Sequence, residues 1–595
     1  MSHGKGYKIV APRSKFYQGP FGRICPDLPA WLPEIDLTPA ELEIAGRVDM
    51  AVEMRLLDVA NRHMIEVTEP SKKPQDVVDA GTDRDDGNDS NIPAGYTYFG
   101  QFVDHDITFD PASSLMRQND PSGLLNHRTP RLDLDNLYGG GPAASPHLYD
   151  NGDKFKFAIG EVLEVINEGT DTEQTLVLPD LPRVNTQRLG PGDTATAVIG
   201  DPRNDENIIV SQLHLAFLLA HNTLFDAAIK LTQNQKRREE LTDTEKEAAF
   251  NQARTTLHWL YQHIVWNDFL RRISDPAIHK AALQLEDVNT ADDEPTGIKR
   301  WKLGLDHIYK WKNQPFMPLE FSVAAYRFGH TLVRNSYQTN GPHRGFQEFA
   351  PIFDNSVGRP DNDQPDDLRG RRMMLAKNVL QWDWFLNMRS SGGPFPQMTR
   401  RFDTKLSNAL AFLHERKLNI GDDIEEPTER KMNFLAFRNL LRGYRFDLPS
   451  GTSVAKKYCL PEIDLNPEVD IDALWYYILK EADLQGDGNR LGKVGSAIVC
   501  ATFAGLLTGD PNSYFNCEPC WHPANDDLLK SLLDDGDMML NQDPKLEDPE
   551  DRRRNARDAT GEEVWTLASI IRLSELPVDA GDFNNLILND AEGPR

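Results

Sequence analysis

The segment 200–225, GDPRNDENIIVSQLHLAFLLAHNTLF, indicates the fold most clearly. From residue 208 onward, its apolar side chains and two histidines recur at intervals of three and four residues, the period of an α-helix with one broad apolar face. The stripe consists of Val210, Leu213, His214, Phe217, Leu218, His221, Leu224 and Phe225. Such a face is buried in a protein interior, so the segment predicts a core helix.

The same periodicity returns at 257–270 and 321–333, whereas strand-like alternation of polar and apolar residues is rare. Polar stretches rich in glycine, proline and aspartate separate the helical segments, and no internal repeat is present. These features predict a mainly α fold, with one large helical domain, irregular loops and little β structure.

The composition excludes several classes of partner. Acidic residues outnumber basic ones by 92 to 65, which gives the 595-residue chain a formal net charge of −27. Nucleic acid requires a basic surface and anionic membranes attract one, so we expect neither as a partner. The apolar run 497–507 is too short to span a bilayer, and no membrane span is expected. No apolar signal region opens the sequence, so we expect a cytoplasmic protein or one exported by a signal-less route.

The cysteines carry little information. Five of them do not define a disulfide framework. Cys517 and Cys520 form a C-E-P-C pair, for which a loop thiol pair or a local disulfide is the simplest interpretation.

The first candidate site is the segment GQFVDHD at 100–106, where Asp104 and Asp106 flank His105. A carboxylate in this position can bind a hard cation, and an imidazole that titrates near neutrality can act as a general base. The residues alone leave a structural and a functional role about equally open. We expect the cluster at a loop or at the start of a helix.

The second candidate is TPRLDLDNLYG at 129–139. Thr129, Arg131, Asp133 and Asp135 alternate at spacing two, so that in an extended loop their oxygens turn the same way. Carboxylates, a hydroxyl and carbonyls are the ligands that calcium prefers. The alternative is an ordinary turn-rich surface loop.

Three further clusters are weaker when each is considered alone. Arg203 and Glu206 precede the long helix, where an ordinary acidic helix start is the simpler interpretation. His330 lies in the apolar pattern EFSVAAYRFGHTLVR at 320–334, where a hydrogen-bonded core histidine is more common than a metal ligand. Asn439 and Arg442 belong to NLLRG at 439–443. Motifs for serine hydrolases, zinc proteases, Walker-type loops and dinucleotide binding are missing.

Taken in order, the five segments resemble the animal-type haem peroxidases, the myeloperoxidase-like branch of the peroxidase–cyclooxygenase superfamily. The resemblance runs from about Tyr96 to Tyr514 and looks most like a bacterial-type member. It implies an oxidoreductase dependent on hydrogen peroxide that oxidises halides, thiocyanate or small aromatic donors through a ferryl porphyrin-radical intermediate. It also implies an N-terminal extension at 1–90, a catalytic domain at 91–515 and a charged C-terminal tail with short helices at 516–595.

The resemblance implies a role for each motif residue. His105 matches the distal histidine, and Gln101 and Arg203 match its catalytic neighbours. His330 matches the ligand of the haem iron. The other matched haem contacts are Asp104 and Glu206, which would form ester links, Asn439 beside the iron ligand, and Arg442 at a propionate. The matched calcium ligands are Asp106, Thr129, Arg131 through its backbone carbonyl, Asp133 and Asp135. The implied cofactors are therefore a haem b derivative and Ca²⁺.

Two departures and two alternatives accompany this resemblance. Asn207 follows Glu206 where myeloperoxidase has the methionine of a third haem link, and the family motif departs after Gly443. A fatty-acid dioxygenase of the same superfamily is the first alternative, but its radical tyrosine would stand at position 327, which is Arg327, with Tyr326 one residue away. A calcium-binding module without catalytic activity is the second. The sequence does not indicate the oligomeric state.

Overall fold

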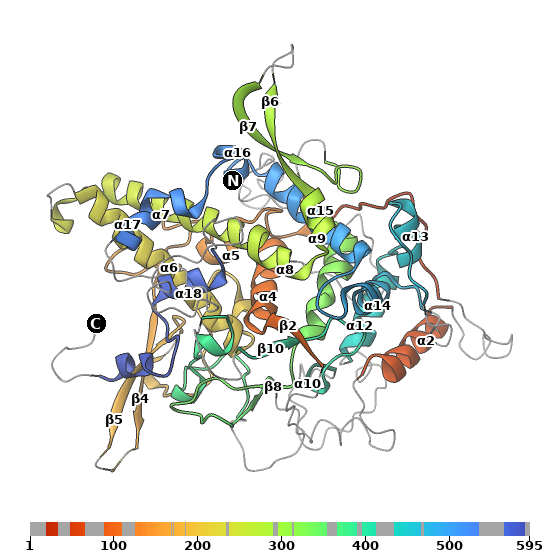
Figure 1. Ribbon diagram of the computed structural model, residues 1–595. Helices are drawn as coiled ribbons and strands as arrows, with labels where there is room; N and C mark the ends of the chain where they lie inside the picture. Colours follow the sequence, from red (N-terminus) through yellow and green to blue (C-terminus); the bar gives the residue numbers. More distant parts are fainter. Residues whose placement is uncertain are drawn as a thin grey trace, which may run out of the picture.

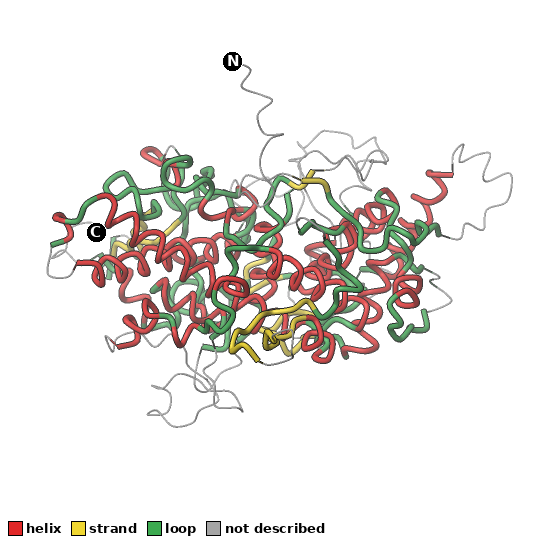
Figure 2. The backbone as a smooth tube through the Cα atoms, turned by 90° about the horizontal axis from the view of Figure 1, so that it is seen from above, coloured by secondary structure: helices red, strands yellow, loops and turns green. Residues whose placement is uncertain are grey.

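The computed structural model describes residues 19–33, 48–65, 88–109, 125–167, 169–170, 172–184, 186–233, 237–289, 295–311, 315–353, 366–388, 396–411, 434–465, 469, 471–534 and 565–588. Helices dominate this part of the chain, and strands are few and short (Figure 2). The expected mainly α fold with irregular loops is confirmed.

The α-helices are α2 (Val48–His63), α4 (Gly95–Ile107), α5 (Asp135–Tyr138), α6 (Ile208–Gln233), α7 (Asp243–Ile264), α8 (Arg271–Ile273), α9 (Pro276–Ala282), α10 (Asn408–Ala411), α12 (Leu435–Arg445), α13 (Gly451–Lys457), α14 (Leu474–Gly486), α15 (Lys493–Gly509), α16 (Tyr514–Cys517), α17 (Asp527–Asp534) and α18 (Leu567–Ser574). Helix α4 lies at the centre, with α6, α7 and α18 on one side and α12, α14 and α15 on the other (Figure 1).

The strands form antiparallel pairs in the described residues. They are β1 (Gly19–Pro20) with β3 (Leu125–Asn126), β2 (Asp89–Pro93) with β10 (Met398–Arg400), β4 (Gly160–Ile166) with β5 (Gln174–Asp180), β6 (Leu283–Asn289) with β7 (Pro295–Leu303), and β8 (Ser336–Tyr337) with β9 (Ala350–Pro351). The β4–β5 and β6–β7 hairpins project from the helical body (Figure 1). The helices, and not these small two-stranded sheets, therefore form most of the core.

Helix α6 forms as its periodicity predicts. The Asn207 side chain caps its start, with Oδ1 accepting from the Val210 backbone N–H at 2.9 Å. Its apolar face packs on α4, α7 and α18. The helix is long and apolar enough to cross a membrane, but 83% of its most apolar window is buried inside the protein, as in the core helix of a globular domain.

Two expected helices take a different form. Helix α7 ends at Ile264 and continues as a π-helix at Val265–Leu270. The segment expected as one α-helix at 321–333 is a π-helical turn at Glu320–Ala324 followed by a 3₁₀-helix at Ala325–Leu332. Arg327 Nε donates to the Ser322 carbonyl at 3.1 Å within this segment. His330 therefore lies on a 3₁₀-helix and not on an α-helix.

The C-terminal residues contain the expected short helix. Helix α18 packs on α6, and the Leu567 backbone N–H donates to Asp268 Oδ2 at 3.0 Å. The division into extension, domain and tail stays a prediction, because much of 1–90 and the segments 535–564 and 589–595 lie outside the described residues. All five cysteines are described and are free thiols, so Cys517 and Cys520 are not joined.

Candidate active site

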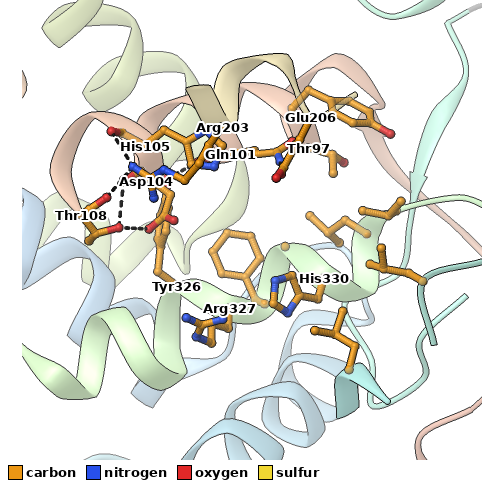
Figure 3. A pocket seen from close by; sticks show the side chains of 18 of the residues that line it. Thr97, Gln101, Asp104, His105, Thr108, Arg203, Glu206, Tyr326, Arg327 and His330 are labelled. Atoms are coloured by element: carbon orange, nitrogen blue, oxygen red, sulfur yellow. Dashed lines mark hydrogen bonds between the residues drawn. The ribbon is translucent and has the colours of Figure 1, made fainter. Parts of the chain in front are cut away.

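A cavity of about 810 Å³ brings the sequence motifs together. Gln101, Asp104 and His105 line one wall from α4, together with Arg203 and Glu206 from the segment before α6. His330 lies across the cavity with Tyr326 and Arg327 (Figure 3). Two histidines from distant parts of the chain thus face one ligand-sized space.

The first wall follows from the spacing on α4. Gln101, Asp104 and His105 are three and four residues apart and therefore share one helical face. The sequence misplaced this cluster, because His105 lies in the last turn of α4 and not at a helix start. Thr108, the residue that ends the helix, donates its hydroxyl to the Asp104 carbonyl at 3.0 Å and to Asp104 Oδ1 at 2.9 Å. This double contact fixes the Asp104 carboxylate on the cavity wall.

His105 is only 5% exposed, and its Nδ1 lies 2.7 Å from Asn204 Oδ1. Burial, reinforced by the charge of Arg203, lowers its pKa to about 4. The imidazole is therefore neutral near pH 7, as a general base must be.

Arg203 is held rigidly beside this histidine. Its Nη2 donates to the His105 carbonyl at 3.1 Å, to the Thr108 carbonyl at 2.7 Å and to Asp201 Oδ2 at 2.8 Å. The guanidinium also lies 4.8 Å from the centre of the Phe109 ring. A fixed positive charge therefore lies beside a neutral base.

Glu206 faces the cavity a short distance along the same wall. Burial among protein atoms raises its pKa to about 7, although Arg203 and Arg371 act in the opposite direction. Gln101 Nε2 donates to Glu206 Oε1, and Gln101 Oε1 accepts from Asn207 Nδ2 at 3.2 Å. The Gln101 amide is thus held between two side chains of the Arg203 segment.

The opposite wall presents His330. Its Nδ1 lies 2.9 Å from the side-chain amide Nδ2 of Asn439 on α12. Burial and the charges of Arg327, Arg438 and Arg442 lower the pKa of His330 to about 3. The ring is therefore neutral and available as a ligand, and Arg442 lines the same cavity.

The predicted calcium residues gather behind the first wall. Asp106, Asp133 and Asp135 each offer an oxygen within 4.8 Å of the others. Thr129 Oγ1 donates to Asp133 Oδ2 at 2.9 Å, whereas the Arg131 side chain turns toward Asp510, 3.8 Å away. Sequence and structure agree on the three carboxylates as one cluster.

The electrostatics of this cluster favour a cation. Burial and repulsion from the neighbouring carboxylates raise the pKa values of Asp106 and Asp133 well above the usual range of an aspartate. Burial also raises the pKa of Asp135 to about 6. Asp106 Oδ1 and Asp133 Oδ1 are buried without a hydrogen-bond partner in the described part of the chain. Unpaired buried carboxylate oxygens are costly, and a bound cation would satisfy both.

Sequence reasoning missed two groups at the site. Asn204, between the two motif residues Arg203 and Glu206, contacts His105 directly, and nothing in the residue type marked it out. Arg371, which lines the cavity with a left-handed φ of 59°, belongs to none of the motifs singled out from the sequence. Only the fold brings Arg371 to the cavity and Asn204 to the buried side of His105.

One protein family and several known proteins match parts of this chain. The animal haem peroxidase family matches residues 114–362, a range that includes Arg203, Glu206 and His330. A peroxidase-like protein from Margaritifera margaritifera is 27% identical over 286 residues, covering 41% of this chain and 32% of that protein. Chorion peroxidase from Drosophila melanogaster is 28% identical over 184 residues, covering 29% of this chain and 19% of that protein. The matches thus span about a third or less of these relatives.

Among solved structures, peroxidase A from Dictyostelium discoideum is similar with a TM-score of 0.47 and 15% identity, covering 85% of this chain and 91% of that chain. A fatty acid alpha-dioxygenase from Oryza sativa has a TM-score of 0.45 and 14% identity, covering 78% of this chain and 77% of that chain. The family match and the two peroxidase-named relatives thus show that this chain is similar to animal-type haem peroxidases over the matched residues.

Proposed function

We propose that the chain binds haem in the cavity between His105 and His330 and acts as a hydrogen peroxide-dependent peroxidase on small anionic or aromatic donors. The observation that carries this proposal is the arrangement of the two histidines on opposite walls of the cavity. A neutral histidine beside a fixed arginine lies across the cavity from a second neutral histidine, which an asparagine contacts at 2.9 Å.

The residues present fit a haem. The cavity of about 810 Å³ is within the size range of cofactor sites. A Cβ added to Gly329, next to His330, would meet no atom within 4 Å, so the space beside this histidine is open. Two hydroxyls of the lining, Thr97 Oγ1 and Ser322 Oγ, are buried without a partner among the described residues.

His330 would hold the iron through Nε2, and Arg442 would pair with an anionic ring substituent. A 180° rotation of the Asn439 amide brings its oxygen to His330 Nδ1, so that His330 donates there and keeps its Nε2 lone pair. Asp104 and Glu206 are the side chains proposed to form ester links, because both carboxylates face the cavity. The bound iron porphyrin would supply the electrons that reduce peroxide.

Side chains of this protein carry out the proton transfer and stabilise the developing charge. His105 Nε2 takes a proton from the peroxide oxygen that enters the cavity, and the same atom returns it to the departing oxygen. Arg203 stabilises the negative charge that develops on the separating oxygens, and its three carbonyl and carboxylate contacts keep it from moving as the charge forms.

Calcium is proposed at the Asp106, Asp133 and Asp135 cluster. Asp106 follows His105 directly in α4, so a cation bound there would fix the end of the helix that carries the base. Tyr261 already donates its hydroxyl to Asp106 Oδ2 at 3.1 Å.

A fatty-acid dioxygenase remains the second candidate because of one observation. Tyr326 lines the cavity on the same 3₁₀-helix as His330, and its hydroxyl donates to the Gly100 carbonyl at 3.3 Å. Oxygen uptake with linoleate, in the absence of peroxide and abolished in Tyr326→Phe, would favour this function over a peroxidase.

The test of the proposal is expression with added haem. We expect a coloured protein with a Soret band that reacts with hydrogen peroxide and then oxidises iodide or a small phenol. His105→Ala should keep the Soret band and lose the fast peroxide reaction, whereas the exposed His147→Ala should change neither. Colourless protein after haem-supplemented expression would refute the proposal.

A further inference from the structure

A buried chain of hydrogen bonds runs from the cavity into the core. His105 Nδ1 lies 2.7 Å from Asn204 Oδ1, and Asn204 Nδ2 lies 3.0 Å from His214 Nδ1 on α6. The exposed fractions are 5% for His105 and 0% for Asn204 and His214. One asparagine amide thus bridges two buried histidines.

The amide gives this chain a direction. In this orientation of the Asn204 amide, the carbonyl oxygen faces His105 and can only accept, so His105 donates from Nδ1 and its Nε2 carries no hydrogen. An amide NH₂ only donates, so His214 must accept at Nδ1 and carry its hydrogen on Nε2. The arrangement selects the His105 tautomer whose remaining ring nitrogen can accept a proton.

His214 is an unexpected residue for its place in the core. Its Nε2 is buried with no hydrogen-bond partner in the described residues, and its ring packs edge-on against Phe102. An apolar side chain would avoid this orphaned polar atom. His221 lies two helical turns further along the same face of α6. Both of its ring nitrogens have hydrogen-bond partners, the Tyr138 hydroxyl and the Phe155 carbonyl, as expected of a purely structural histidine. The feature that distinguishes His214 is its contact with Asn204.

The turn that carries Asn204 is clamped on both sides. It is a 3₁₀-helix at Pro202–Asp205, in which Asp201 accepts from the backbone N–H of Arg203 and pairs with Arg128. At its other end, Asp205 pairs with the buried Arg183 at 2.7 Å. These ion pairs leave the Asn204 backbone little freedom, so its amide is held in place as a fixed hydrogen-bond partner.

We propose that Asn204 and His214 act together as positioning residues for the peroxide-cleaving base, fixing His105 in the tautomer with hydrogen on Nδ1. This inference rests on the proposed function for its consequence, but the tautomer itself is a property of the chain. Asn204 holds the acceptor toward His105, and His214 holds the amide in that orientation by accepting from its NH₂ group.

The first experiment measures the tautomers in the full chain labelled with ¹⁵N-histidine, with resonances assigned from His105→Gln and His214→Phe. We expect hydrogen on Nδ1 of His105 and on Nε2 of His214. Asn204→Asp keeps an acceptor and should keep the His105 tautomer, whereas Asn204→Leu should lose it. Hydrogen on Nε2 of His105 in the wild type would overturn the inference, and this result requires no haem.

The second experiment measures two rates in haem-loaded protein: peroxide reduction, and association of hydrogen cyanide, whose proton His105 must also accept. Asn204→Leu should slow both by about 10- to 100-fold, part of what a general base contributes, with the Soret band kept. Asn204→Asp should restore most of the rate. Asn222→Ala, a control on α6 whose amide bonds only to Phe157 among the described residues, should leave both rates within twofold.

The decisive comparison is a double mutant. His214→Phe should slow both rates in the wild type but have no further effect in Asn204→Asp, which no longer donates to His214. Equal slowing in both backgrounds, or rates within twofold of wild type for Asn204→Leu, would overturn the inference. Failure of the wild type to bind haem or to react with peroxide would instead refute the proposed function.

Discussion

Replacing Asp135 by asparagine should reveal whether the three buried carboxylates form a cation site. Without a cation, burial raises the pKa of Asp135 from 3.8 to about 6. A raised pKa in the folded state means that the carboxyl contributes stability below its unfolded pKa, and that this contribution disappears as the pH rises through about 6. The asparagine has no proton to lose and shows no such dependence.

The magnitude follows from this pKa. A rise from 3.8 to about 6 corresponds to about 3 kcal/mol, of which roughly 2 kcal/mol is lost between pH 4.5 and pH 7.5. In EDTA, the free energy of unfolding of Asp135→Asn should therefore improve by about 2 kcal/mol relative to the wild type over this range. For a chain of 595 residues that unfolds in one step, this is about 2 °C in Tm.

Calcium should reverse the order. At pH 7.5, Ca²⁺ at 100 times its Kd should stabilise the wild type by about 2.7 kcal/mol and Asp135→Asn by much less. Differential scanning calorimetry of each protein at pH 4.5 and pH 7.5, with EDTA or with Ca²⁺, covers all four conditions. Asp226→Asn removes a carboxylate that pairs with Lys156 and Arg238 away from this cluster, and it should keep the full calcium response. Equal calcium responses in wild type and Asp135→Asn would refute this reasoning.

Four further predictions concern the cavity proposed to bind haem. His330→Ala should lose the Soret band or show free-haem absorption, while Asn439→Asp should keep haem and lower its reduction potential in a spectroelectrochemical titration, because a carboxylate makes His330 a stronger donor. Acid-acetone should leave haem attached to the wild type but extract it from the double variant of Asp104→Asn and Glu206→Gln; complete extraction from peroxide-treated wild type would contradict the ester links. The second-order rate with peroxide should stay flat from pH 5 to pH 8 and fall only as His105 is protonated near pH 4 in stopped-flow measurements; a fall centred near pH 6.5 would contradict the lowered pKa.

Periodicity predicted the parts of this fold that depend on burial alone. Helix α6 begins and runs as its apolar stripe indicates, because a broad apolar face forces a helix into the core. Periodicity failed at 320–332, where the expected α-helix is a π-helical turn followed by a 3₁₀-helix. The spacing of apolar residues indicates a helix here but does not distinguish α, π and 3₁₀ hydrogen bonding.

The candidate site shows the same division. Motifs identified His105 and His330, because rare residue types in a known order carry information. Asn204 was invisible, since an asparagine in a polar turn is common and only the fold brings its amide between two histidines. The sequence also gave no means to learn that burial depresses the pKa of both cavity histidines, because that effect depends on atoms distant along the chain.

The net charge of −27 points away from anionic substrates, yet the cavity has the opposite character. Among the residues that line it, five are arginines and two are acids: Arg203, Arg327, Arg369, Arg371 and Arg442 against Asp104 and Glu206. Glu206, with a pKa of about 7, carries only part of a charge at neutral pH. Surface charges farther than about 8 Å are largely screened at physiological salt, whereas those inside a low-dielectric cavity are not. An anion that reaches the cavity mouth therefore responds to the arginines more than to the overall charge, as the proposed binding of anionic ring substituents and small anionic donors requires.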